Sequence, residues 1–145
     1  MKKPMYSMRR LAAVAAAGLL SIVGILAVPT PAMASADSCT GAPNGYVCVY
    51  VQGEGAFIDT ITVSRGSINI PMGICNWRAD AWIDDNTGRQ IKFLRYDYAG
   101  CNYGRAWVDF PLNHAWVGCG SRVYAAFYED GKRQGGYAGP VRICG

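Results

Sequence analysis

The sequence predicts an all-β domain, a small Greek-key sandwich or barrel stapled by disulfides, and three observations support this fold class. Short segments with β-branched and aromatic side chains alternate or run apolar, and Gly, Asn or Asp bounds each of them. No stretch after the first 36 residues shows a sustained helical period. Six cysteines, an even number, are spread along the same part of the chain. We therefore expect seven or eight short strands.

Residues 1–36 have the pattern of a secretory signal peptide. Four basic residues and no acid occupy residues 1–10, an apolar run covers residues 11–28, and Ala34-Ser35-Ala36 forms a small-x-small cleavage site. We expect cleavage after Ala36, a secreted extracellular protein and no stable membrane insertion afterwards. The apolar run is about eighteen residues long, the lower limit for a membrane span, so an uncleaved anchor is the alternative.

The remaining part, residues 37–145, has the size of one domain. Removing 36 of the 145 residues leaves 109, which is enough for a single core. Fourteen Lys and Arg less the four in the leader leave ten, and ten Asp and Glu balance them. A net charge near zero argues against a nucleic-acid-binding protein and against an electrostatic membrane binder, because both need a clustered basic face.

The six cysteines indicate three disulfides in an exported chain. Metal ligation would need close cysteine pairs with histidine partners, whereas the nearest cysteines are nine residues apart and the sequence holds one His. The sequence alone does not choose among the pairings. Loop lengths and expected strand edges favour Cys39 with Cys48, Cys75 with Cys101, and Cys119 with Cys144.

The expected strands begin with two that alternate clearly. Residues 46–52 place three valines on one face, and residues 57–63 alternate Ile61 and Val63 with threonines. Residues 79–84 and 89–98 form the clearest hairpin, because Asp85-Asn86-Thr87-Gly88 between them is a turn sequence. The set is completed by residues 105–110, 121–129 and 137–144, with Asp130-Gly131 as the turn between the last two.

A weak internal repeat is visible in the same elements. Residues 45–63, 89–110 and 121–143 each read as a strand, a polar turn with Gly and a second strand. Three such hairpins would stack as a Greek-key or trefoil-like arrangement. The alternative is that any β protein repeats strand, turn and strand.

Two segments resemble a known family. GYVCVY follows an upstream cysteine in residues 39–50, and residues 84–107 read DDNTGRQIKFLRYDYAGCNYGRAW. In these motifs the chain resembles small exported actinobacterial proteins of the metalloproteinase-inhibitor family. The resemblance implies a fold similar to a βγ-crystallin domain and an inhibitory function, although six cysteines and the tail of residues 117–145 depart from the family pattern. Residues 84–89 have the acids of a crystallin-type calcium site but neither of its hydroxyl side chains in the required place, so we expect no calcium there. We expect no other cofactor either.

Catalytic patterns are weak in this sequence. The cysteines are expected to be oxidised, and His114 lies in a loop-like stretch without a Gly-x-Ser-x-Gly elbow, so nucleophilic catalysis is not favoured. A carboxylate-pair hydrolase is the better enzymatic alternative, because a glycosidase needs only two acids. Most of the acids fall at expected turns and no pair stands out. We expect no catalytic residue and no metal site.

Aromatic side chains are the most suggestive feature, with four Trp, eight Tyr and four Phe in residues 37–145. Six of them are expected to face outward, namely Tyr96, Tyr98, Tyr103, Trp107, Tyr124 and Tyr128. The expected inward positions are Phe93, Val108, Val123 and Phe127. With Arg95 and Arg105 nearby, the exposed rings resemble a recognition surface, and a core on both faces is the alternative.

We therefore expect a secreted binding protein whose partner is an extracellular protein, first of all a proteinase, or a glycan. An inhibitor would present a rigid loop or strand edge, and residues 52–57 and 98–104 are the expected loops. The expected binding residues are Glu54, Tyr98, Asn102, Tyr103, Arg105 and Trp107. The alternatives are a secreted antimicrobial or toxin-like protein and a small carboxylate-dependent hydrolase or cyclase.

Overall fold

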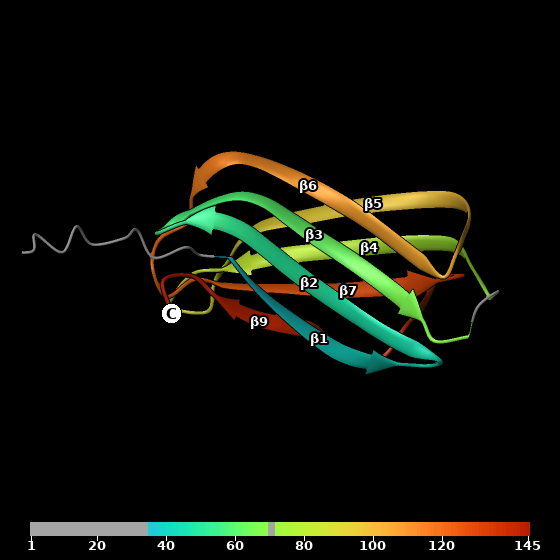
Figure 1. The fold of residues 1–145 in the computed structure, drawn as a ribbon. Coiled ribbons are helices and arrows are strands. Elements are labelled where there is room, and N and C mark those ends of the chain that lie inside the picture. The colour runs from blue at the N-terminus through green and yellow to red at the C-terminus, as the bar shows by residue number, and fades with distance from the viewer. Residues whose placement is uncertain (1–34, 70–71) are drawn as a thin grey trace, which may run out of the picture.

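The computed structural model describes residues 35–69 and 72–145, which fold into two packed β-sheets (Figure 1). The predicted signal peptide, apart from its last two residues, lies outside the described residues. No helix occurs in the described part, and so none there is long and apolar enough to cross a membrane. The strands are β1 (Ala36–Ala42), β2 (Gly45–Glu54), β3 (Phe57–Ser67), β4 (Gly73–Asp84), β5 (Gln90–Tyr103), β6 (Arg105–Trp116), β7 (Arg122–Glu129), β8 (Lys132–Arg133) and β9 (Ala138–Arg142).

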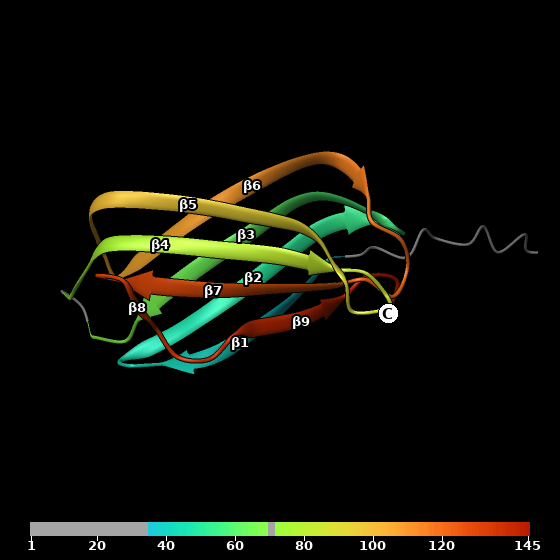
Figure 2. The same ribbon diagram turned by 180° about the vertical axis from the view of Figure 1, so that it is seen from behind.

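The two sheets are antiparallel and form a sandwich, which confirms the predicted fold class. Sheet A has the strand order β1-β2-β3-β6. Sheet B has the order β5-β4-β7-β8, and β9 also pairs with β7. Figure 1 shows sheet A in front, with its strands running obliquely across those of sheet B, and Figure 2 shows sheet B from its outer side.

The core lies between the sheets and follows the period of two that strands require. The three valines of β2 are fully buried, and so are the alternate positions Ile61 and Val63 of β3, as the sequence predicts. Sheet B contributes Trp77, Ala79, Ala81 and Ile83 from β4 and Val123, Ala125 and Phe127 from β7. Burying each large side chain contributes about 1.5–3 kcal/mol, so this face fixes the register of both sheets.

All three predicted disulfides are present. Cys39–Cys48 joins β1 to β2 and Cys75–Cys101 joins β4 to β5, in each case between directly paired residues. Cys119–Cys144 ties the segment before β7 to the end of the chain. Two of the bridges therefore lock outer strands, β1 and β5, onto their sheets.

A buried arginine connects the sheets at one end of the sandwich. Arg65 on β3 is 4% exposed, and its Nε donates to Glu129 Oε1 on β7 at 3.1 Å. Its other nitrogens donate to the backbone carbonyls of Pro43 and Gly66. The charge is paired and hydrogen-bonded, as a buried guanidinium requires.

The predicted hairpin of residues 89–110 is wrong. Strand β5 pairs with β4 in sheet B, while β6 pairs with β3 in sheet A. The chain crosses between the sheets at Gly104, whose φ of 76° gives a corner that other residues rarely adopt. The β2–β3 hairpin and the pairing of β7 with β9 are confirmed.

Three further expectations about β5 are also wrong. Residues 98–104 were expected to form a loop, but they continue β5 up to Tyr103. Phe93 was expected inside, yet it pairs with Trp82 on the outer face of sheet B and is 46% exposed. Tyr96 and Tyr98 were expected to face outward, but they pair with the buried residues Ala79 and Trp77 and so lie on the inner side. The alternation of side chains along β5 predicts two different faces, but the pairing of β5 with β4 determines which of these faces points to the core.

Candidate functional site

The outer face of sheet B carries arginines and aromatic rings at alternate positions. Because Trp77, Ala79 and Ala81 of β4 point into the core, Arg78, Asp80 and Trp82 point to the opposite side. The register carries this alternation onto the neighbouring strands. We call the resulting surface the arginine-aromatic face, formed by Arg78, Trp82, Phe93, Arg95, Tyr124, Tyr128, Arg133 and Tyr137.

Asp80 lies at the centre of this face beneath two arginines. It is only 4% exposed. Arg95 Nε donates to Asp80 Oδ1 at 2.9 Å and Arg95 Nη2 to Oδ2 at 3.4 Å, and these bonds raise the pKa of Arg95. Arg78 Nε lies 3.3 Å from Oδ1 but is buried without a hydrogen-bond partner among the described residues. The buried carboxylate thus holds two guanidiniums in place.

Three guanidiniums also lie over aromatic rings. The distance from the guanidinium carbon to the ring centroid is 3.9 Å for Arg78 over Tyr128, 5.2 Å for Arg95 over Phe93 and 4.5 Å for Arg133 over Tyr137. Each is within the range of a cation–π contact. The arginines are therefore held on rigid strands with their positive charge at the surface.

Trp82 joins the rings of Tyr124 and Tyr137 into one cluster on this face. Its ring stacks on that of Tyr124 with centroids 5.5 Å apart, and it meets Tyr137 edge to face at 5.2 Å. Such pairs contribute about 0.5–1.5 kcal/mol beyond burial. Tyr137 stays 53% exposed, so the cluster has ring surface accessible from solvent.

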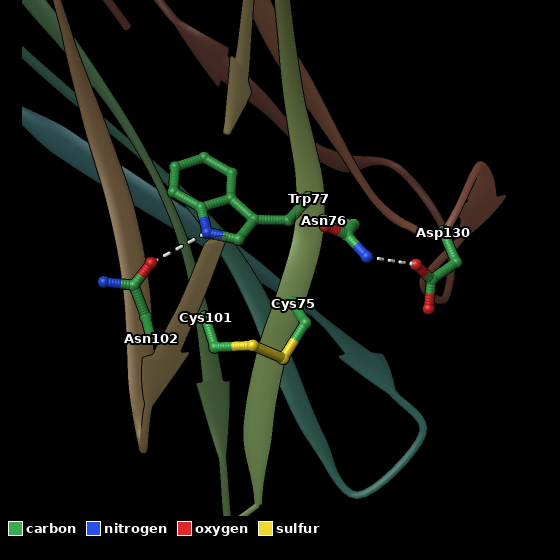
Figure 3. Close-up of a disulfide and its surroundings, with 6 residues drawn as sticks. All are labelled: Cys75, Asn76, Trp77, Cys101, Asn102 and Asp130. Atoms are coloured by element: carbon green, nitrogen blue, oxygen red, sulfur yellow. Dashed lines mark hydrogen bonds between the residues drawn. A yellow bond between two sulfur atoms is a disulfide. The ribbon is translucent and has the colours of Figure 1, made fainter. Parts of the chain in front are cut away.

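A hollow of about 250 Å³ lies at one end of the face, beside an irregularity in β4. Asn76 has a φ of 47° and shifts the register between β4 and β5. Its Nδ2 donates to Asp130 Oδ1 at 3.0 Å, which ties the bulge to the turn after β7 (Figure 3). The hollow is lined by Asn76, Trp77, Arg78, Asp97, Tyr98, Ala99, Tyr128 and Gly131.

The wall of this hollow is fixed from the inside. Trp77 Nε1 donates to Asn102 Oδ1 at 2.8 Å, next to the Cys75–Cys101 bridge (Figure 3). The Trp77 ring also stacks on Phe127 with centroids 5.2 Å apart. The hollow therefore has a rigid lining.

A larger hollow of about 390 Å³ lies at the other end of the sandwich, lined in part by Asp85, Arg89, Ile91 and Trp116. Its carboxylate is already engaged, because Asp85 accepts hydrogen bonds from the Thr87 hydroxyl and from the backbone N–H groups of Thr87 and Arg89. These bonds lower the pKa of Asp85 to about 2. We place the candidate site on the arginine-aromatic face, where the charged groups face outward.

The structure separates the six binding residues expected from sequence. Tyr98 lines the smaller hollow, and Asn102 supports it from behind. Tyr103 and Arg105 flank the corner between β5 and β6, and Trp107 is 56% exposed on the outer side of sheet A. Glu54 pairs with Phe57, which pairs with Trp116, so it lies at the opposite end of sheet A from Arg105.

Several residues of the face could have been found in the sequence. Tyr124, Tyr128 and Arg95 were expected on a recognition surface and do lie on the outer face. Arg78 and Trp82 were missed, although WRADAWID shows the period of two that separates them from Trp77 and Ala79. Arg133 joins the face because it pairs with Tyr128. Tyr137 joins it through the contact of its ring with Trp82, which is distant in the sequence and for which the sequence has no signal.

His114 sits on a bulge of β6 and pairs with an acid. Asn113 and His114 both have positive φ, and His114 Nδ1 lies 2.9 Å from Asp59 Oδ1. The imidazole stacks on Phe57 with centroids 4.5 Å apart. This is an oriented imidazole, but no contact of the described residues adds a Ser, Thr or Cys nucleophile to the pair.

Comparisons with known proteins do not assign this chain to a family. No protein-family model matches the chain, and a search of curated proteins finds no match. Among solved structures, the chain is similar to an endonuclease/exonuclease/phosphatase from Beutenbergia cavernae DSM 12333. The identity is 9% and the TM-score 0.36, over 70% of this chain and 25% of that one, so the chain spans a quarter of that protein's length. This likeness is too low to carry an argument about fold or function.

Proposed function

We propose that this chain is a secreted binding protein that recognises another extracellular protein through the arginine-aromatic face. The observation that carries the proposal is the set of guanidiniums held over aromatic rings on an exposed sheet. The predicted signal peptide and the three disulfides support export, because disulfides persist in oxidising compartments.

The residue types of this face are those that dominate protein interfaces. Trp, Tyr and Arg are enriched among residues whose truncation costs the most binding energy. Here Arg78 and Arg95 are restrained by Asp80 before any partner arrives. Binding would therefore lose less side-chain entropy than it would with free arginines.

The charge distribution supports an acidic partner surface. The strands of sheet B carry seven Lys and Arg against four Asp and Glu, whereas those of sheet A carry two against four. Complementary charge raises association rates and selects partners. Residues 37–145, whose Lys and Arg balance their Asp and Glu, thus carry an excess of cations on the strands of sheet B.

Proteinase inhibition is the specific form that we propose for this binding, following the family resemblance. A sandwich with three disulfides offers a surface that stays ordered in the presence of an enzyme. In this form the contact comes from strands of sheet B rather than from the loop expected at residues 98–104.

The test is inhibition of metallo-, serine and cysteine proteinases by the oxidised protein. We expect stoichiometric inhibition of one class. Arg133→Ala combined with Tyr137→Ala should weaken it at least about tenfold, because both side chains are surface contacts of the face. Trp107→Ala is the matched control, since this exposed ring lies on sheet A.

Three outcomes would contradict the proposal at different levels. Loss of inhibition in Trp107→Ala but not in the double variant would move the site to sheet A. Absence of inhibition in every class would reject the inhibitor form, and selective binding to a glycan array would assign the face to glycans instead.

A further inference from the structure

Strand β5 is the free edge of sheet B. It pairs with β4 on one side, and no described strand pairs with its other side. It is also the longest strand, with 14 residues. A long edge presents a row of unpaired N–H and C=O groups, to which another strand can add.

The side chains of β5 are exposed on both faces of the sheet. Ile91, Phe93, Tyr96, Tyr98 and Tyr103 are 36–72% exposed. Monomeric proteins usually protect such edges with short strands, prolines or several charges. Here the edge is long and has no proline, and its charged residues are Lys92, Arg95 and Asp97.

We propose that β5 pairs antiparallel with β5 of a second copy of this chain. Paired residues of antiparallel strands lie on the same face of the sheet. A two-fold axis perpendicular to the sheet preserves this, and it places one residue of β5 opposite itself. The charged residues of β5 favour one position for the residue on the axis.

Arg95 and Asp97 lie on the same outer face, because they pair with Asp80 and Arg78 of β4. An axis at Arg95 or at Asp97 would oppose like charges, which destabilises a strand pair. An axis at Tyr96 places Arg95 opposite Asp97 of the other copy twice. Asp97 makes no ion pair within the described residues, so it is free for this contact.

The same register also pairs apolar side chains on the inner face. Tyr96 faces its counterpart, and Leu94 faces Tyr98 of the second copy. Tyr96 and Tyr98, which are 41% and 36% exposed in one copy, would be covered. The two arginine-aromatic faces would then adjoin on one continuous sheet, although the dimer does not depend on the proposed function.

The test is sedimentation equilibrium of the oxidised protein over a concentration series. We expect the wild type to dimerise reversibly. Tyr96→Lys and Tyr96→Glu should each weaken the dimer at least about tenfold, because each opposes like charges at the axis. An equimolar mixture of the two variants should restore a dimer, since Lys then faces Glu.

Tyr50→Lys is the matched control, because Tyr50 lies on sheet A and is 42% exposed. It should dimerise like the wild type. Asp97→Lys tests the register without touching the inner face and should also weaken the dimer. A wild type that stays monomeric at every concentration would overturn the proposal. So would a dimer that the Tyr96 and Asp97 variants weaken no more than the control does.

Discussion

Trp77 shows how a single polar contact can hold the wall of the candidate site. The residue is 3% exposed, so its indole N–H has little access to solvent and depends on Asn102. A buried donor without an acceptor carries the full cost of desolvation. Removing the acceptor should therefore lower the stability by more than the net contribution of one hydrogen bond, because the indole N–H would be left unpaired.

Replacing Asn102 by Ala should lower the free energy of unfolding by about 1–3 kcal/mol, because the Trp77 N–H is left unpaired. Asn102→Asp keeps a side chain of the same length with an acceptor oxygen and serves as the control. Urea unfolding followed by tryptophan fluorescence measures both variants. Equal losses in the two variants would show that the hydrogen bond is not what Asn102 provides.

Asp85, at the tip of the β4–β5 hairpin, makes the free energy of unfolding depend on pH. Hydrogen bonds from Thr87 first, and from the backbone of Arg89, lower its pKa from 3.8 to about 2. An unfolded chain takes up this proton at higher pH than the folded one. The contribution is therefore fully present above about pH 4 and is lost as the pH falls to about 2.

We expect the wild type to lose stability over this range more steeply than Asp85→Asn, whose side chain does not titrate. Urea midpoints between about pH 5 and about pH 2 provide the comparison. Asp84→Asn is the control, since this neighbouring carboxylate accepts none of the bonds of the turn. If the Asp85 variant keeps the wild-type slope and the Asp84 variant does not, the assignment is wrong.

At the scale of elements, the disulfides differ in how much unfolded chain they restrain. Cys75–Cys101 closes a separation of 26 residues and Cys39–Cys48 one of 9. The loop-entropy relation gives about 3.5 and about 2.6 kcal/mol for the two. Replacing Cys75 and Cys101 together by Ala should therefore destabilise the protein by about 1 kcal/mol more than the same change at the shorter bridge. Chemical denaturation of both double variants decides this, and a larger loss at the shorter bridge would contradict the entropic account.

Local alternation and cysteine spacing predicted the parts of the fold that short segments determine. Val47 and Ile61 were expected inside and are fully buried. Strand β1 was missed, because ADSCTGA has no apolar period and is a strand only through its pairing with β2. The crossing at Gly104 was missed for a related reason, since it depends on which strands β5 and β6 find in the folded chain.

The same limit explains the candidate site. The period of two in residues 90–103 predicts that β5 has two different faces. Both faces are largely exposed in the structure, so the hydrophobicity of the side chains does not indicate which face points to the core. The ring cluster of Trp82 also combines residues from β4, β7 and the loop after β8. Such a surface forms only when the strands pair, so the sequence does not predict it. The alternating positions of Arg78 and Arg95 can be recognised in the sequence.

On the scale of the whole molecule, charge is segregated between the two sheets. Ten Lys and Arg balance ten Asp and Glu in residues 37–145, yet the cations concentrate on sheet B. A partner or a charged matrix senses the local potential rather than the sum. Residues 37–145 should therefore bind an anionic surface at low salt although their Lys and Arg balance their Asp and Glu.

Cation-exchange chromatography at pH 7 tests this segregation directly. Arg133→Gln with Arg142→Gln removes two charges from the outer side of sheet B, where both arginines are exposed. Arg89→Gln with Arg105→Gln removes the same number of charges elsewhere. We expect the first double variant to elute at clearly lower salt than the second, because retention depends on the basic face. Identical elution of the two would show that retention follows total charge alone, and the electrostatic argument for an acidic partner would then fail.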